Sequence, residues 1–268
     1  MKENVYIRMN NRKYITKVEM ITRYLYKFLN KVRVEKIESG MILLLPQNYK
    51  RRKIYKCLKK YENLNIIYSN EIKQMLNDSN IKCDYTGKKL MKFILEELID
   101  YVCNLTKCNK FLEDIFILVN DYSKENLEII DRLVKSFKIV NIVTSNISKF
   151  KILERKYERN NILITVSNNK RKGVKRAKLI VNFDFDNCMF QKYEILNNVI
   201  IINLNNEKIT PKNNFNGIII NDYNINIDNE KMLYFQEYYG NIETKIMIES
   251  CMENTEYYQV KKWLKITM

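Results

Sequence analysis

The chain has 268 residues, a formal net charge of +16 and no histidine. A chain of this length can bury one large core or two smaller ones. Its apolar runs, such as residues 41–45, are far shorter than the roughly 18 residues that a membrane-spanning helix needs, so we expect no membrane partner. No apolar segment follows the charged start of the chain, which predicts no secretory signal, a cytoplasmic location and reduced cysteines.

The basic charge raises the question of nucleic-acid binding, because Lys and Arg side chains neutralise phosphates. Two clusters stand out: Lys50-Arg51-Arg52-Lys53 with Lys56, Lys59 and Lys60, and Lys170-Arg171-Lys172 with Lys175 and Arg176. The chain is also rich in Lys, Asn, Ile and Tyr and has a single alanine, a composition that AT-rich codons produce on their own. Neither cluster shows the aromatic interleaving of a single-strand binding platform. Nucleic acid is therefore a partner that the sequence allows but does not favour.

The first part of the chain alternates between strand and helix patterns. A short apolar run at 41–45, closed by Pro46, predicts a buried strand. A basic helix follows at 49–61, then a strand at 65–69 and a short helix from Glu71. This alternation is typical of a parallel sheet covered by helices. A long helix is expected at 88–105, where apolar residues keep helical spacing.

After this helix the alternation continues more regularly. Strands are expected at 115–119, 139–143, 162–166, 178–183, 199–203 and 218–221, with helices at 125–137 and 148–158. Six strands in this order predict a Rossmann-like domain. The fold class is thus α/β, with a small N-terminal α/β domain followed by a Rossmann-like parallel-sheet domain. We place the first domain at 1–105, the second at 106–230, and C-terminal helices that pack back at 231–268.

Three short motifs, in this order of elements, resemble those of the shikimate dehydrogenase family, which uses NADP. They are Cys83-Asp84-Tyr85-Thr86-Gly87, Ala177-Lys178-Leu179-Ile180-Val181-Asn182 and Met232-Leu233-Tyr234-Phe235-Gln236. The resemblance implies that Asp84 binds and polarises a substrate hydroxyl, that Asn182 lies beside the nicotinamide ribose, and that Gln236 hydrogen-bonds the substrate. Without the resemblance, Asp84 is explained as a helix cap and Asn182 as part of a buried strand.

The chain departs from the family where the chemistry is decided. The family's general-base lysine stands two residues after a proline, and here Asn48 holds that position after Pro46. Lys50 replaces the lysine only if the loop bulges by two residues. No paired serines occur in residues 1–30 to hold a substrate carboxylate. Hydride transfer at a carbinol needs a group that takes the hydroxyl proton, and asparagine cannot take it.

The expected phosphate loop, Val119-Asn120-Asp121-Tyr122-Ser123, contains no glycine. A pyrophosphate needs close approach to backbone N–H groups at a helix start, whereas Asp121 repels phosphate and Tyr122 fills its space. Asp121 or Ser123 is explained more simply as a helix N-cap. We therefore expect no cofactor. A dinucleotide, if bound, contacts Asn120 and Asp121 and is NADP, because Thr144, Ser145 and Lys149 follow the second strand where NAD-binding proteins carry an acidic residue.

Two further signals are weak. Asp184 and Asp186 alternate at the end of a strand and mark either an acidic rim of an interdomain cleft or a loop boundary. Cys103 and Cys108 have no histidine to complete a zinc site, so no metal is expected.

Three functions follow from these patterns. The first is a diverged shikimate-dehydrogenase-like protein without standard dehydrogenase activity, which binds an unknown small molecule or protein partner. The second is an active NADP-dependent oxidoreductase acting on a small hydroxy or keto acid. The third is a basic nucleic-acid-associated protein, whose binding weakens steeply as salt rises.

Overall fold

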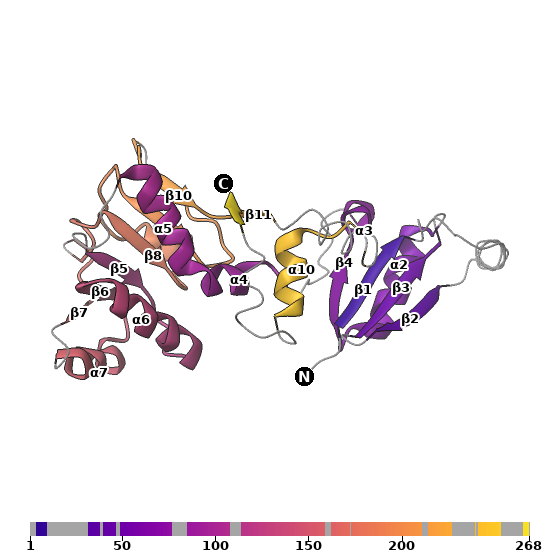
Figure 1. Ribbon diagram of the computed structural model, residues 1–268, viewed down its shortest axis with the longest axis horizontal. Helices are drawn as coiled ribbons and strands as arrows, with labels where there is room; N and C mark the ends of the chain where they lie inside the picture. Colours follow the sequence, from indigo (N-terminus) through magenta and orange to yellow (C-terminus); the bar gives the residue numbers. More distant parts are fainter. Residues whose placement is uncertain are drawn as a thin grey trace. The chain divides into compact units, whose positions relative to one another are not determined.

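A computed structural model describes residues 4–9, 32–37, 40–46, 49–76, 85–107, 114–158, 162–171, 173–210, 214–226, 239, 241–252 and 265–267 (Figure 1). The chain forms two compact units, the first from Met1–Lys89 with Asn224–Thr267 and the second from Leu90–Tyr223. Most of the helical segment that we expected to end the first domain lies in the second unit. The C-terminal segment lies in the first unit.

The first unit contains a four-stranded sheet with the order β2-β3-β1-β4. Its strands are β1 (Asn4–Met9), β2 (Arg33–Ile37), β3 (Gly40–Leu45) and β4 (Asn65–Tyr68). The central strand β1 is parallel to β3 and β4, while the edge strand β2 is antiparallel to β3. The strands β3 and β4 confirm the expected strands at 41–45 and 65–69. The strands β1 and β2 were not predicted, because polar and charged residues interrupt their apolar ones.

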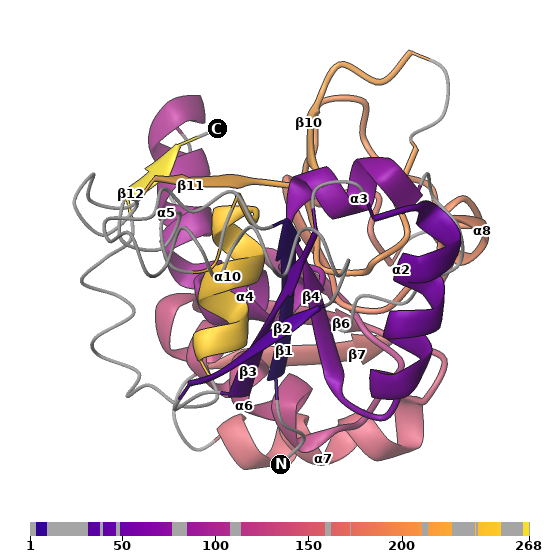
Figure 2. The ribbon, with the colours of Figure 1, turned by 90° about the vertical axis from the view of Figure 1, so that its right-hand side faces the viewer.

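Both faces of this sheet are covered by helices (Figure 2). Alternate residues of β1 separate to the two faces, as strand geometry requires. Val5 and Ile7 pack against Ile54 of α2 (Arg51–Leu58) and Ile72 of α3 (Asn70–Leu76). On the opposite face, Tyr6 packs in a cluster with residues of α10 (Thr244–Cys251). The short helix η1 (Lys59–Tyr61) continues α2, so the basic helix expected at 49–61 is confirmed.

Residues of the C-terminal segment, which belongs to the first unit, contact the N-terminal part of that unit through polar as well as apolar side chains. Asn4 Nδ2 donates to the Ser250 carbonyl at 3.2 Å, and the Asn70 N–H donates to the Asn241 carbonyl at 2.7 Å. The strands β11 (Asn224–Asn226) and β12 (Lys265–Thr267) pair antiparallel. Among the described residues of this segment, α10 is a helix and β12 is a strand.

The second unit contains a six-stranded sheet in which all strands are parallel. Its strands are β5 (Ile115–Leu118), β6 (Ile139–Val143), β7 (Leu163–Ser167), β8 (Leu179–Asn182), β9 (Ile200–Asn203) and β10 (Ile218–Ile220). Their order in the sheet is β10-β9-β8-β5-β6-β7, which is the doubly wound order of the Rossmann fold. All six strands lie within one or two residues of the expected positions. The predicted fold class is confirmed.

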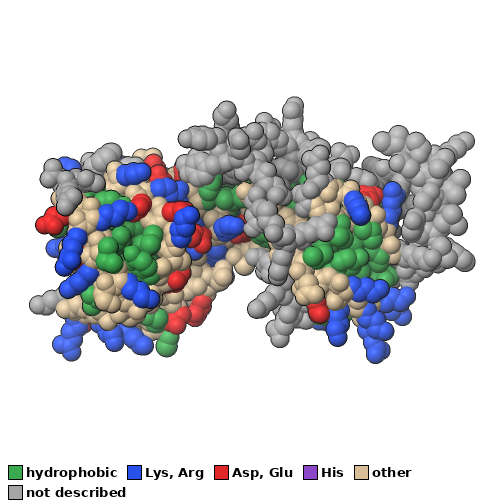
Figure 3. Space-filling model, turned by 90° about the horizontal axis from the view of Figure 1, so that it is seen from below, with side chains coloured by type: hydrophobic (Ala, Val, Ile, Leu, Met, Phe, Trp, Pro, Cys, Tyr) green, Lys and Arg blue, Asp and Glu red, His purple; other side chains and the backbone are tan. Residues whose placement is uncertain are grey.

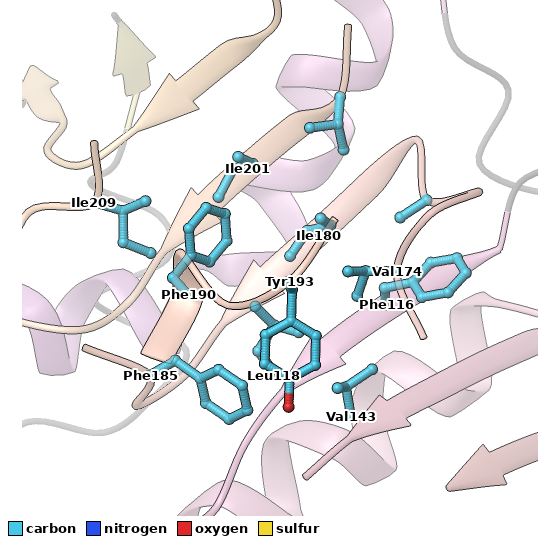
Figure 4. Close-up of a cluster of buried hydrophobic side chains, with 12 residues drawn as sticks. Phe116, Leu118, Val143, Val174, Ile180, Phe185, Phe190, Tyr193, Ile201 and Ile209 are labelled. Carbon is cyan, nitrogen blue, oxygen red and sulfur yellow. The ribbon is translucent and has the colours of Figure 1, made fainter. Parts of the chain in front are cut away.

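Helices and loops cover the faces of this sheet. The helices are α4 (Lys88–Phe93), α5 (Leu95–Thr106), α6 (Lys124–Ser136), α7 (Ile147–Glu158) and α8 (Asn187–Phe190). The helix expected at 88–105 is divided at Ile94, whose backbone angles leave the helical region. One face of the sheet packs against the connections around β8, where Phe185, Phe190 and Tyr193 join Phe116 and Ile180 in a continuous core (Figure 4).

Candidate functional site

The carboxyl ends of β5 and β8 mark the place where ligands bind in sheets of this kind. The strand order reverses between these two neighbours, and crevices open at such a switch point. The parallel register places Leu118 beside Asn182, so the loops that follow start at the same level. Asn120 and Asp184 each stand two residues beyond this pair. The candidate site is the set of residues in these loops and in the loop that follows β6.

The Asp184 carboxylate accepts hydrogen bonds from the backbone at the start of the loop after β5. The Asn120 N–H lies 2.8 and 3.0 Å from its two oxygens, and the Asp121 N–H lies 2.6 Å from Oδ2. These are the N–H groups that precede α6, where a dinucleotide-binding fold presents donors to a pyrophosphate. A carboxylate of the protein itself therefore uses the donors that an anionic ligand would need.

Two opposing effects act on the pKa of Asp184. Burial raises the pKa above its usual range, because desolvation disfavours the charged form. The hydrogen bonds from Asp121 and Asn120 and the positive charge of Lys92 oppose this rise, and the charge of Asp121 adds to it. Burial is the larger effect, so Asp184 is protonated at a higher pH than an ordinary aspartate.

Asn120 ties the loop after β5 to the loop after β6. Its Oδ1 accepts from the Ser145 N–H at 2.8 Å and from Ser145 Oγ at 2.6 Å. Thr144 Oγ1 lies 3.4 Å from the same oxygen, and Asn146 Nδ2 donates to the Asn120 carbonyl at 2.7 Å. The structure thus brings together three of the residues expected to bind a cofactor, Asn120, Thr144 and Ser145, and joins them by direct hydrogen bonds.

The start of α6 is capped by side chains of the same segment. Ser123 is the N-cap, and its Oγ accepts from the Asn126 N–H at 3.4 Å. The buried Asn126 donates back to the Asp121 carbonyl at 3.0 Å. The Tyr122 ring packs edge-on against Phe150 of α7, with ring centroids 5.1 Å apart. Of the two N-cap candidates, Ser123 holds the position, and Tyr122 helps to fix the loop.

Asn182 belongs to a row of asparagines at the carboxyl ends of β8, β9 and β10. Its Nδ2 donates to the Phe185 carbonyl and to Asn203 Oδ1, both at 2.8 Å. Asn203 in turn donates to Asn221 Oδ1 at 2.8 Å. The Asn182 side chain is 0% exposed, so its amide is satisfied inside the protein and fixes the turn after β8.

A pyrophosphate in the standard position does not fit these residues. The two backbone donors already face Asp184, and Tyr122 occupies the loop where dinucleotide-binding folds carry glycine. Lys149 is exposed near the start of α7, and Asp186 caps α8 by accepting from the Met189 N–H at 2.6 Å. Asp184 and Asp186 therefore have separate structural partners. The sequence indicated that both lie at the end of a strand, but it did not indicate these partners.

The substrate residues implied by the family resemblance, Asp84 and Gln236, lie outside the described residues, as does Asn48. Lys50 is exposed directly before α2. Near the expected motif, the buried Glu249 of α10 accepts from the N–H groups of Gly87 and Lys89, the latter at 2.9 Å. Burial raises the pKa of Glu249, and the hydrogen bonds from Gly87 and Lys89 oppose this rise.

No group of three or more potential metal ligands occurs among the residues that the structure describes, and Cys103 is a buried free thiol there. Within the same residues, no helix is long and apolar enough to span a membrane.

No protein-family model matches the chain, and no curated protein matches it. Among solved structures, the chain is similar to L-tryptophan dehydrogenase from Nostoc punctiforme, with a TM-score of 0.38 and 9% sequence identity over 97% of this chain and 78% of that protein. This likeness to an amino acid dehydrogenase concerns the fold alone.

Proposed function

We propose that this chain is a diverged shikimate-dehydrogenase-like protein that lacks standard dinucleotide binding and acts as a binding or regulatory protein. The hydrogen bonds from Asn120 and Asp121 to the Asp184 carboxylate carry the proposal. A bound phosphate would have to displace this carboxylate, and the two anions would repel each other in a partly buried place. The absence of a glycine and the position of Tyr122 support the same conclusion.

The lost chemistry supports a binding role as well. A dehydrogenase needs a proton acceptor beside the reacting hydroxyl, and this chain has Asn48 at the position of the family's lysine and no histidine. A small molecule or a protein is the partner that this account expects. Asp84 and Gln236 stay the candidate contacts for a small molecule.

A second candidate function, an NADP-dependent oxidoreductase, has one observation in its favour. Ser145 follows β6 and Lys149 lies in the first turn of α7. Both are exposed, and no acidic residue lies between Thr144 and Lys149 to disfavour a 2′-phosphate. In this case the 2′-phosphate of the cofactor contacts the loop after β6, and its pyrophosphate displaces Asp184 from the N–H groups of Asn120 and Asp121.

Thermal unfolding with and without ligand separates the two functions. A ligand present at a hundred times its Kd stabilises the folded state by about 2.7 kcal/mol. Such a gain raises the Tm of a domain of this size by several degrees, at about 2–4 °C per kcal/mol. We expect no rise with millimolar NADPH or NADH. A rise of more than about 5 °C with NADPH would replace the first function by the second.

The same measurement with Asp184→Ala provides the internal control. This variant frees the Asn120 and Asp121 donors and removes the repelling charge. A rise in Tm with NADPH in the variant, but not in the wild type, would show that Asp184 excludes the nucleotide. Shikimate is tested in parallel, because a rise with shikimate alone supports retention of the substrate site without the cofactor.

A further inference from the structure

The helix α2 and its continuation η1 carry an exposed row of positive charge on the first unit. Figure 3 shows Lys and Arg side chains projecting from the surface of the molecule. On α2 and η1, the core contacts are made by Ile54 and Leu58, which are buried. Besides Arg51, whose guanidinium donates to the Leu76 carbonyl, the exposed cations are Arg52, Lys53, Lys56, Lys59 and Lys60. Helical spacing places these five cations opposite Ile54 and Leu58, so they form one continuous surface, the α2 basic face.

The charge of the α2 basic face is not neutralised within the described part of the chain. None of its five cations forms an ion pair with another described residue, and Glu62 is the sole acidic residue between positions 46 and 70. The second basic cluster differs, because Lys175 lies 3.9 Å from Glu194 and Arg176 lies 3.5 Å from Asp114. The second basic cluster is therefore partly neutralised by ion pairs, whereas no described residue forms an ion pair with the α2 basic face.

Part of this charge opposes the stability of the helix, although Lys56 in the last turn suits the helix dipole. Lys56 has cations four residues away on either side, at Arg52 and Lys60, and like charges at this spacing destabilise a helix. The first turn has no acidic residue, although negative charge is what the helix dipole favours there. An external polyanion relieves both unfavourable effects.

Tyrosine rings flank the α2 basic face. Tyr49, Tyr55 and Tyr61 are partly buried against the core beneath the helix, with part of each side chain exposed. The Lys53 Nζ lies 5.7 Å from the centroid of the Tyr49 ring, and the Arg51 guanidinium lies 5.8 Å from that of Tyr55. Two rings of this segment thus lie beside cations, Tyr49 beside Lys53 and Tyr55 beside Arg51. Rings beside cations are the combination that binds unpaired bases together with their phosphates.

We propose that the α2 basic face binds single-stranded nucleic acid through its phosphate backbone, without sequence preference. Arg52, Lys56 and Lys60 follow at four-residue intervals and form a row about 12 Å long, which spans roughly three phosphates. The face offers cations, which contact phosphates, and no Asn, Gln, Asp or Glu side chain to read the other base edges, so we expect little sequence preference. A membrane surface fits less well, because none of the exposed large hydrophobic side chains in the described residues lies on α2.

The test is fluorescence anisotropy of a labelled 20-nucleotide single strand of mixed sequence, titrated with the full chain between 50 and 200 mM salt. Five phosphate contacts predict a slope of log Kobs against log salt of about −3.5. The triple variant Arg52→Gln, Lys56→Gln, Lys60→Gln should bind at least tenfold more weakly and reduce the slope by about 2. Tyr49→Leu should weaken single-strand binding about fivefold or more, with an unchanged salt slope.

A matched control removes the same amount of charge elsewhere. Lys170→Gln, Lys175→Gln, Arg176→Gln leaves the same net charge as the α2 variant, and its affinity should stay within twofold of the wild type. Circular dichroism establishes that both variants are folded. Equal losses in the two variants would overturn the proposal in favour of a general charge effect. Binding of phosphatidylserine vesicles without binding of the oligonucleotide, or no binding of either, would also overturn it.

Discussion

The Asp121 N–H donates to Asp184 Oδ2 at 2.6 Å, although 63 residues separate the two along the chain. Through this hydrogen bond, a side chain of the protein itself occupies a backbone N–H group at the start of α6. The same hydrogen bond links the loops after two neighbouring strands of the sheet, and it occupies a backbone donor of the kind that binds phosphate at a helix start. The stability and the binding properties of the second unit should both depend on it.

Removal of the Asp184 carboxylate should destabilise the chain. Asp184→Ala leaves the N–H groups of Asn120 and Asp121 without their acceptor, and we expect a loss of about 1–2 kcal/mol in the free energy of unfolding. Urea titration followed by circular dichroism measures this loss. The control is Glu128→Ala on exposed α6 surface, where the ion pair with Lys124 contributes at most about 0.5 kcal/mol. Equal losses in the two variants would mean that the Asp184 hydrogen bonds contribute no more to the free energy of unfolding than a surface ion pair does.

Stability should depend on pH through Asp184 and Glu249. Burial raises the pKa of both carboxyls in the folded state above the unfolded value of about 4. The folded state then binds protons at a higher pH than the unfolded state. The contribution of these groups to the free energy of unfolding is fully present below pH 4, and it is lost as pH rises through the raised pKa values.

Urea titrations between pH 4 and pH 8 test this dependence. Asp184→Asn and Glu249→Gln each remove a titrating group, so each should flatten the decline in stability toward neutral pH. Glu128→Gln serves as the control, because Glu128 is largely exposed. If the pH profile is unchanged in both Asp184→Asn and Glu249→Gln, the pH dependence of stability does not come from these two carboxyl groups.

The asparagine row should be important for the fold. Asn182→Ala deletes the buried amide that contacts Phe185 and Asn203, and it leaves the Phe185 N–H and carbonyl without this side-chain partner. We expect a loss of about 2–3 kcal/mol in the free energy of unfolding. Asn198→Ala at an exposed position should change it by less than about 0.5 kcal/mol. A loss for Asn182→Ala as small as that of the control would show that the row is not structural.

Two glycines of the first unit should respond differently to a methyl group. A Cβ at Gly40 would lie 2.0 Å from the Asn4 carbonyl oxygen of the central strand, where the backbone has no room to move. A Cβ at Gly87 would lie 3.0 Å from the flexible Lys245 side chain, with φ at +80°. Gly40→Ala should therefore cost more than about 3 kcal/mol, and Gly87→Ala about 1–2 kcal/mol. Thermal unfolding ranks the two, and a reversed order would contradict the sheet register.

The fold of the second unit was predictable because its four inner strands, β5, β6, β8 and β9, are buried on both faces. Such strands appear as short runs of Ile, Val and Leu, and the order of six runs led to the correct fold class. In β1 the apolar Val5 and Ile7 alternate with polar residues, including the buried Arg8. With Asn4 and Arg8, the segment lacks a continuous apolar run of the kind that marked the other strands, so the central strand of the first unit was missed.

The candidate site was predictable in position but not in its contacts. Asn120, Asp121 and Asp184 were recognised at strand ends, where ligands bind in this fold. Their hydrogen bonds depend on the register Leu118 to Asn182, which a single sequence does not reveal. The one sequence signal for these hydrogen bonds was that Asn120 follows β5 and Asp184 follows β8, the two strands on either side of the switch point.

The most direct test of the account is the response of the Asn120 and Asp121 amide resonances to NADPH in ¹⁵N-labelled protein. With Asp184 as their partner, both amide shifts should stay constant up to millimolar NADPH in the wild type. In Asp184→Ala, the same amides should shift with NADPH or inorganic pyrophosphate. Saturable shifts of both amides in the wild type would contradict the account, because they would place a phosphate where it assigns the Asp184 carboxylate.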